Sequence, residues 1–184
     1  MIEPFNEKWL KGSFVTLRRM EKDDREAFIE MESNMENRLF MNDAIPFPPT
    51  DDDHDQFLNG ISADKEEYLF AIERMNDQAF IGTISIYAIN WVNGTCHVGI
   101  SIGSPHQGKG LGTDAMNALL DFIFHYLRIN KVKLSVFSFN QRAIRSYEKC
   151  GFQHEGVLRQ EIFRFGQYHD LIVMGILREE WKKK

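Results

Sequence analysis

Residues 107–113 read Gln-Gly-Lys-Gly-Leu-Gly-Thr and stand between a predicted strand and a predicted long helix. Glycines let the backbone turn tightly and approach a ligand closely, and the free N–H groups in the first turn of a helix favour an anion. The stretch therefore predicts a phosphate-binding loop at a strand-to-helix junction. A loop whose glycines only make a tight turn is the alternative.

Two familiar nucleotide-binding loops do not fit this stretch. The nucleotide P-loop requires Ser or Thr after Gly-Lys, whereas Lys109 is followed by Gly110. The dinucleotide fingerprint requires a glycine where Thr113 stands, and an acidic residue at the end of the next strand, which residues 131–138 do not provide. The phosphate group to be bound therefore belongs to another kind of ligand.

The residues after the loop predict a strand–helix–strand crossover. Apolar residues recur at three- and four-residue steps, as expected for one face of a long helix, at Leu111, Ala115, Ala118, Leu119, Phe122 and Tyr126. Residues 131–138 alternate like a strand, and a short helix over 141–149 ends at Gly151. A helix that follows one strand and precedes another predicts parallel neighbours.

The first half of the chain predicts helices and then an antiparallel meander. Asp23 or Asp24 can cap a helix with Phe28 and Met31 on its apolar side, followed by a less regular stretch to Phe40. A second helix is expected from Thr50, after a proline-rich loop over 46–49. Strands are expected over residues 14–19, 68–73, 79–89, 95–102, 131–138, 156–164 and 169–178.

The fold class that follows is α/β (α+β), with a mixed, mostly antiparallel sheet of about seven strands flanked by helices. The 184 residues, 43% of them hydrophobic, suit one domain over residues 1–184. No apolar run is long enough for a membrane helix, and residues 1–5 carry an acid and a proline where an export signal needs a basic start, so we expect a cytoplasmic protein.

The net charge and the cysteine and histidine residues limit which partners and metal ions are expected. A net charge of −5 argues against nucleic acid as a partner and mildly suits a cationic one. Cys96 and Cys150 lack metal-ligand spacing and are expected to be reduced, and the six histidines stand singly, so no metal is expected.

Two linked motifs resemble those of the GNAT N-acetyltransferase family. Gln107, Gly110 and Gly112 form the pattern Gln-x-x-Gly-x-Gly, which resembles that family's pyrophosphate-binding motif. About 30 residues later the chain is similar to the family's Asn-x-x-Ala-x-x-x-Tyr-x-x-x-Gly-Phe pattern, at Asn140, Ala143, Tyr147, Gly151 and Phe152. Residues 15–18 and 155–159 resemble the branch that contains ribosomal-protein and spermidine acetyltransferases. The resemblance spans nearly the whole chain.

The resemblance implies a fold and a cosubstrate. The fourth and fifth strands, residues 95–102 and 131–138, would splay apart around the pantetheine arm of acetyl-CoA, and the transfer would need no metal. Asn140 would cap its helix and also hydrogen-bond the pantetheine. Acetyl-CoA would be bound by Ile102, Gln107, Gly108, Lys109, Gly110, Leu111, Gly112, Thr113, Asn140 and Tyr147.

The resemblance also implies the catalytic groups for direct attack of an amine on the thioester. Tyr147 would be the acid that protonates the departing thiolate, and the N–H of Ile102 lies where an oxyanion donor is needed. His97 stands where relatives of this branch often carry glutamate, so an imidazole would be the base. A structural histidine with deprotonation through water is the alternative, as is a core tyrosine at position 147.

The acceptor stays open among the amine of a peptide N-terminus, a small-molecule amine and a polyamine. Its pocket would be formed by residues 20–65, including the loop 46–49, and by the turn 164–169. A polyamine would need converging carboxylates, for which the sequence offers Glu32, Glu36, Asp51, Asp52, Asp53 and Asp55. A homodimer through the final strands would reshape this pocket. A non-catalytic acyl-CoA-binding regulator is the alternative of another class, against which Tyr147 and Asn140 argue.

Overall fold

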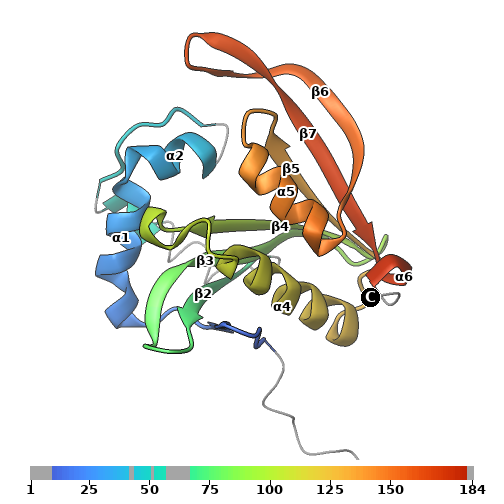
Figure 1. Cartoon of the computed structure of the whole chain (residues 1–184), viewed down its shortest axis with the longest axis horizontal. Helices are drawn as coiled ribbons and strands as arrows, with labels where there is room; N and C mark the ends of the chain where they lie inside the picture. The colour runs from blue at the N-terminus through green and yellow to red at the C-terminus, as the bar shows by residue number, and fades with distance from the viewer. Residues whose placement is uncertain (1–9, 42–43, 51, 57–66, 182–184) are drawn as a thin grey trace, which may run out of the picture.

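A seven-stranded sheet forms the centre of the computed structural model, which describes residues 10–41, 44–50, 52–56 and 67–181 (Figure 1). Residues 52–56 are helical. The other elements in chain order are β1 (Val15–Arg18), η1 (Lys22–Asp24), α1 (Arg25–Ser33), α2 (Met35–Met41), β2 (Tyr68–Arg74), β3 (Ala79–Asn90), β4 (Thr95–Ile102), η2 (Ser104–His106), α4 (Leu111–Tyr126), β5 (Lys131–Phe137), α5 (Gln141–Cys150), β6 (Gln153–Arg164), β7 (Gln167–Leu177) and α6 (Arg178–Trp181).

The strand order β1-β2-β3-β4-β5-β7-β6 confirms the predicted mixed sheet. Every neighbouring pair is antiparallel except β4 and β5, which are joined by the α4 crossover and run parallel. The β4–β5 pairing covers three positions, from Thr95 opposite Lys131 to His97 opposite Lys133. Beyond His97 the two strands part, and the expected splay between the fourth and fifth strands is confirmed.

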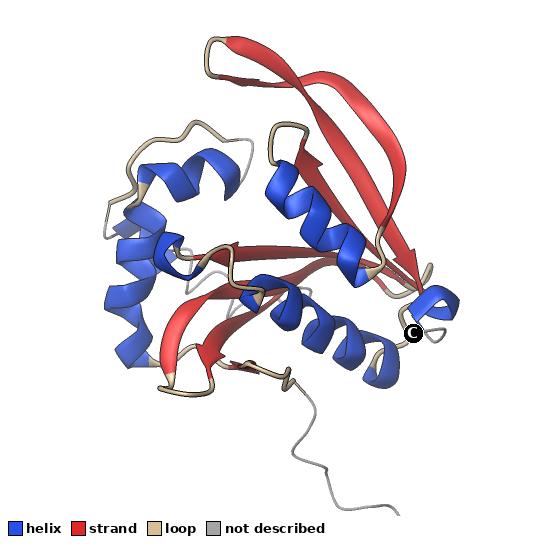
Figure 2. Ribbon diagram, in the orientation of Figure 1, coloured by secondary structure: helices blue, strands red, loops and turns tan. Residues whose placement is uncertain are grey.

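Helices cover the sheet and leave a space above the splay. α4 and α5 lie side by side, with the Thr113 and Ser146 hydroxyls 2.7 Å apart (Figure 2). α1 contacts β3, and α2 contacts β4 near the end where β4 leaves β5. The α2 and α5 helices therefore stand on opposite sides of the gap.

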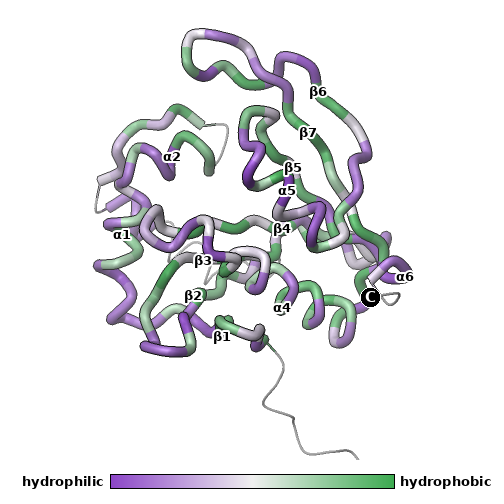
Figure 3. The backbone as a smooth tube through the Cα atoms, viewed as in Figure 1, coloured by the Kyte–Doolittle hydropathy of each residue, from purple (hydrophilic) through white to green (hydrophobic). Residues whose placement is uncertain are grey.

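The core joins the middle strands to α4. Ile84, Ile86 and Val98 are buried with Leu119 and Leu120 of the helix, as the predicted helical stripe requires. Figure 3 shows hydrophobic residues along the second half of β7 and mostly hydrophilic residues on α1. None of the described helices is long and apolar enough to span a membrane.

Several predicted details are corrected by the structure. The stretch before Phe40 is a regular helix, α2, and β6 begins at Gln153 rather than at residue 156. The last strand ends at Leu177, and α6 begins at Arg178, whose side chain donates hydrogen bonds to the carbonyls of Leu127 and Ile129. These bonds cap the end of the α4 segment.

The helix starts of the first third differ in their capping. Asp24 precedes α1, but its carboxylate accepts bonds from Arg18 and from the Glu21 N–H instead of capping α1. Thr50 and Asp53 form a reciprocal capping pair, with Thr50 N donating to Asp53 Oδ2 at 2.8 Å and Asp53 N donating to Thr50 Oγ1 at 3.2 Å. The predicted helix start at Thr50 is confirmed.

Candidate active site

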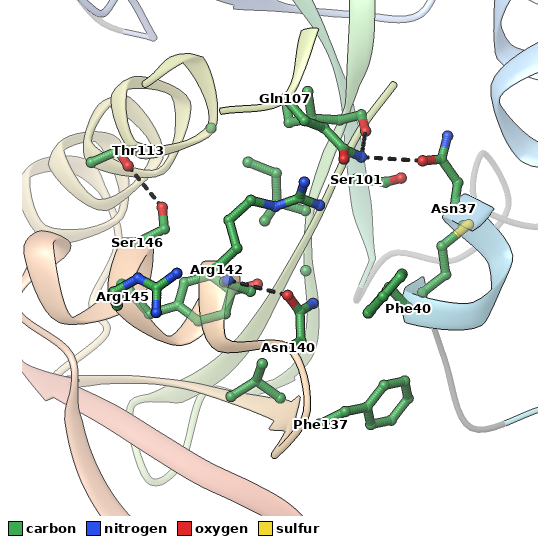
Figure 4. A pocket seen from close by; sticks show the side chains of 18 of the residues that line it. Asn37, Phe40, Ser101, Gln107, Thr113, Phe137, Asn140, Arg142, Arg145 and Ser146 are labelled. Atoms are coloured by element: carbon green, nitrogen blue, oxygen red, sulfur yellow. Dashed lines mark hydrogen bonds between the residues drawn. The ribbon is translucent and has the colours of Figure 1, made fainter. Parts of the chain in front are cut away.

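A cavity of about 600 Å³ lies where β4 and β5 part. Its walls come from α2, the end of β4, the turn before α4, the end of β5 and one face of α5. Figure 4 shows Phe40 and Phe137 on one side of the cavity, and Thr113 and Arg145 on the other. The predicted phosphate loop and the predicted second motif therefore meet at one place.

The loop presents bare backbone to the cavity. Gly108 and Gly110 have φ angles of 74° and 80°, a region that favours glycine, and a Cβ at either position would meet nothing within 4 Å. Gly110 precedes α4 directly, so the N–H groups of its first turn, including those of Gly112 and Thr113, have no partner within the helix. This arrangement is a ready site for a phosphate.

The side chains of the loop brace it from behind. Gln107 Nε2 donates to the Ile102 carbonyl at 2.6 Å and to Asn37 Oδ1 at 3.1 Å. Lys109 Nζ donates to the Pro105 carbonyl at 2.9 Å. The cavity lining contains Gln107 but neither Lys109 nor Leu111, whose side chain is buried in the core.

Tyr147 lines the cavity from α5, with its ring 5.9 Å from that of Phe152. Burial raises the pKa of its phenol well above the ordinary value, and Tyr87 and Cys150 act in the same direction. The phenol therefore keeps its proton at neutral pH and can serve as a hydrogen-bond donor in the cavity. Asn140 lies about two turns earlier, lines the cavity and caps α5 by accepting from Ala143 N at 3.2 Å.

His97 lies on β4 at the last paired position, and it does not line the cavity. Its ring packs against Tyr87, 5.6 Å away, and Tyr87 does line the cavity. Burial and then the Lys133 charge lower the pKa of His97 below 6.5, so its imidazole is neutral at neutral pH. Ser101, four residues further along β4 and on the same face as His97, lines the cavity directly.

The end of β4 directs a backbone donor into the gap. Gly103 N donates to the Ile81 carbonyl of β3 at 2.9 Å. Because successive N–H groups of a strand point to alternate sides, the N–H of Ile102 points away from β3, toward β5. Ile102 therefore has the orientation that an oxyanion donor requires.

Some lining residues were missed by the sequence analysis. Arg142 and Arg145 follow each other at three residues on α5, with Lys149 four residues later, and all three line the cavity. Their helical spacing was a signal available in the sequence. The role of Asn37 could not be predicted from the sequence, because its partner is distant along the chain. Its buried side chain joins α2 to the loop by accepting a hydrogen bond from Gln107.

Comparison with known proteins identifies the family. The family model described as "Acetyltransferase (GNAT) domain" matches residues 15–153, which contain the loop, both parting strands and Tyr147. The chain belongs to the GNAT acetyltransferase family.

Similar proteins cover nearly the whole GNAT chain. An uncharacterized N-acetyltransferase of the SPbeta prophage in Bacillus subtilis (strain 168) is 31% identical over 93% of this chain and 94% of that protein. A spermidine N(1)-acetyltransferase of Vibrio cholerae is 32% identical over 92% of this chain and 96% of that protein. The crystal structure of the spermidine N-acetyltransferase from Vibrio cholerae, in complex with CoA and spermine, has a TM-score of 0.84 at 30% identity, covering 92% of this chain and 99% of that one.

This GNAT enzyme therefore transfers an acetyl group from acetyl-CoA to an amine, and the expectation of an enzyme rather than a regulator is confirmed. The residues present suit acetyl-CoA. Free N–H groups at the start of α4 match a pyrophosphate, and the cations of α5 add positive charge beside them. In the described part of the chain, no group of three or more His, Cys, Asp or Glu side chains could hold a metal ion.

Proposed function

We propose that the chain, as one domain over residues 1–184, acetylates a primary amine of a small molecule or a peptide by direct attack on acetyl-CoA. The observation that carries the proposal is Tyr147, a protonated phenol in the cavity where β4 and β5 part. The pyrophosphate would bind the N–H groups of residues 108–113, and the thioester would extend between the strands toward Tyr147.

The bonding changes assign a role to each group. The neutral amine attacks the acetyl carbon, and the N–H of Ile102 stabilises the negative charge that forms on the carbonyl oxygen. The C–S bond then breaks, and the thiolate takes the proton of Tyr147. The attacking nitrogen gives up its extra proton to water or to a base reached through water, and Tyr147 is reprotonated from solvent.

Acetyl transfer is tested by following thiol release from acetyl-CoA with a panel of peptides, alkylamines and polyamines. Because the acid would be removed, Tyr147→Phe is expected to lower kcat by ~100-fold or more, with little change in acetyl-CoA affinity. The matched control is Tyr126→Phe, an exposed tyrosine on α4. Equal kcat for both variants would remove Tyr147 from the mechanism.

We propose His97 as the base that accepts the proton of the attacking amine through water. Its neutral imidazole does not line the cavity but packs against Tyr87, which does. A base works only when unprotonated, so kcat/KM should fall as the pH drops below 6.5, through the lowered pKa of His97. His97→Gln is expected to remove this acid limb, whereas His125→Gln, an exposed histidine on α4, keeps it. An acid limb that persists in His97→Gln would favour deprotonation by solvent alone.

We also propose a homodimer formed through β6 and β7. β6 is one of the two edge strands of the sheet, and the hairpin exposes Val157, Leu158, Phe163 and Tyr168, each roughly half exposed or more. Sedimentation equilibrium is expected to give twice the chain mass. Val157→Lys should yield monomer, whereas Val92→Lys, at an exposed turn position, should not.

A further inference from the structure

Aromatic side chains gather at the end of the cavity away from the phosphate loop. Phe40 of α2 and Phe137 of β5 line the cavity, and the Phe139 ring lies 5.6 Å from the first and 5.2 Å from the second. Behind Phe139 lie His169 at 4.7 Å and Phe165 at 5.4 Å. We call these five residues the aromatic cluster. The cluster brings together three separate stretches of the chain: α2, the end of β5 and the β6–β7 hairpin.

The β6–β7 hairpin fixes the outer side of the aromatic cluster. Its turn holds Phe165 at a φ of 54°, which is uncommon for a bulky residue and costs about 1 kcal/mol. Arg164 beside it donates to the Ala44 carbonyl of the loop after α2 at 2.7 Å. His169 Nε2 lies 3.1 Å from the Arg164 carbonyl. The hairpin turn and the α2 loop are therefore joined around the cluster.

The carboxylates that would suit a polyamine are engaged elsewhere. Asp53 accepts from Thr50 at its own helix start, and Asp55 pairs with Arg25 at 2.9 Å. Asp51 lies outside the described residues.

Two further acids stand on the α1–α2 side. Burial raises the pKa of Glu32 to about 7, against the opposing charge of Arg38, and Glu32 does not line the cavity. Among the described residues, Glu36 is the carboxylate that lines the cavity, whereas Asp52 is exposed and lies outside the cavity. The predicted ring of carboxylates does not converge on the described cavity walls.

We infer that the acceptor end selects a primary amine with one positive charge and an apolar or aromatic stem, the stem lying against Phe40 and Phe137. The inference rests on the proposed acetyl transfer and specifies its acceptor. Apolar surface gains free energy when it leaves water, and aromatic rings add edge-to-face contacts with an aromatic stem.

A second ammonium group on the stem would lose binding at this place. It would leave water to lie against phenyl rings, and among the described cavity walls Glu36 is the one carboxylate that could pair with it. A cation over a phenyl face recovers only part of this cost. A linear polyamine therefore fits this cavity worse than a monoamine of equal length.

Acceptors that differ in one feature test whether the cavity prefers an apolar stem or a stem with a second ammonium group. With saturating acetyl-CoA, thiol release is measured for hexylamine and 1,6-diaminohexane, which differ only in the second amine, and for 2-phenylethylamine, spermidine and ethylamine. The kcat/KM of hexylamine should exceed that of the diamine by ~10-fold, and 2-phenylethylamine should be the best of the five.

A variant locates the effect in the aromatic cluster. Phe40→Ala is expected to lower kcat/KM for 2-phenylethylamine by ~10-fold, mainly through KM, and to leave ethylamine, which has almost no stem, unchanged. Phe14→Ala, at an exposed phenylalanine beside β1, is the control. A preference for spermidine or the diamine, or equal losses for all amines in Phe40→Ala, would overturn the inference while leaving acetyl transfer intact. Thiol release with none of the amines would overturn both proposals.

Discussion

The two ends of the cavity are built on different principles. At the cofactor end, one continuous stretch supplies the phosphate-binding backbone, because residues 107–113 bring both the turn and the start of α4. At the acceptor end, the aromatic cluster comes from α2, the end of β5 and the β6–β7 hairpin, and residues far apart in sequence must meet. The first end binds through backbone N–H groups and charge, and the second through apolar contact.

Because of this difference, the two ends of the cavity should respond differently to substitution. A phosphate is bound by main-chain donors that any side chains leave in place, provided that glycine permits the turn. An apolar wall depends on each contributing side chain, so changes on α2 or the hairpin would alter the acceptor without touching the cofactor end. Substitutions at the cofactor end should therefore change the kinetic constants for acetyl-CoA, and substitutions at the acceptor end should change those for the amine.

The largest effect is expected from Gly110→Val. A valine at a φ of 80° strains the turn, and its side chain would occupy the open space in front of the α4 N–H groups. The Kd for acetyl-CoA, measured by calorimetry, should rise by ~100-fold, which corresponds to about 2.7 kcal/mol.

Gly166→Val provides the matched control, since Gly166 has a similar φ of 76° and equally open surroundings at the hairpin turn. It should lower the melting temperature but leave acetyl-CoA affinity unchanged. If both variants weakened acetyl-CoA binding equally, strain transmitted through the fold would explain the loss better than direct contact at the loop.

Sequence analysis reached one end of the cavity much better than the other. The loop, the crossover, Asn140 and Tyr147 were predictable because their chemistry is local, and their spacing carries the signal. The role of Phe139 was not predictable, since its partners are set by strand pairing and by the hairpin turn. The carboxylates of residues 51–55 looked promising in sequence, but helix capping and an ion pair engage those of Asp53 and Asp55.

Asn37 links the two ends, and removing it tests whether they are independent. Its Oδ1 accepts from Gln107 Nε2 and Ser104 Oγ, both at 3.1 Å, and its Nδ2 donates to the Met31 carbonyl. Asn37→Ala leaves these buried groups without their partner, at a cost of ~2 kcal/mol in the free energy of unfolding. The KM values of both acetyl-CoA and the amine should rise several-fold.

Asn93→Ala, at the exposed β3–β4 turn, should change neither KM nor stability by a comparable amount. If Asn37→Ala raised the KM of acetyl-CoA alone, α2 would hold the acceptor wall without help from the loop. The comparison between the two ends would then become sharper, since no bridge between them would carry free energy.

A smaller effect, confined to the cofactor end, is expected when the guanidinium groups of Arg142 and Arg145 are replaced by glutamine. These side chains face the cavity beside the start of α4, where the phosphates of acetyl-CoA would lie (Figure 4). The double variant should raise the KM of acetyl-CoA by ~10-fold, because two charge-assisted contacts are lost at a partly solvated surface. The KM of a monoamine should not change, since the aromatic cluster binds it without charge.

Ionic strength distinguishes charge from packing in this variant. Salt screens exposed charges, so raising it should increase the KM of acetyl-CoA in the unmodified enzyme more than in the double variant. Arg159→Gln, an exposed arginine of β6 outside the cavity, should retain the full salt dependence. An unchanged salt dependence in the double variant would mean that the N–H groups of α4 bind the phosphates unaided. The cofactor end would then depend on backbone alone, as the acceptor end depends on side chains alone.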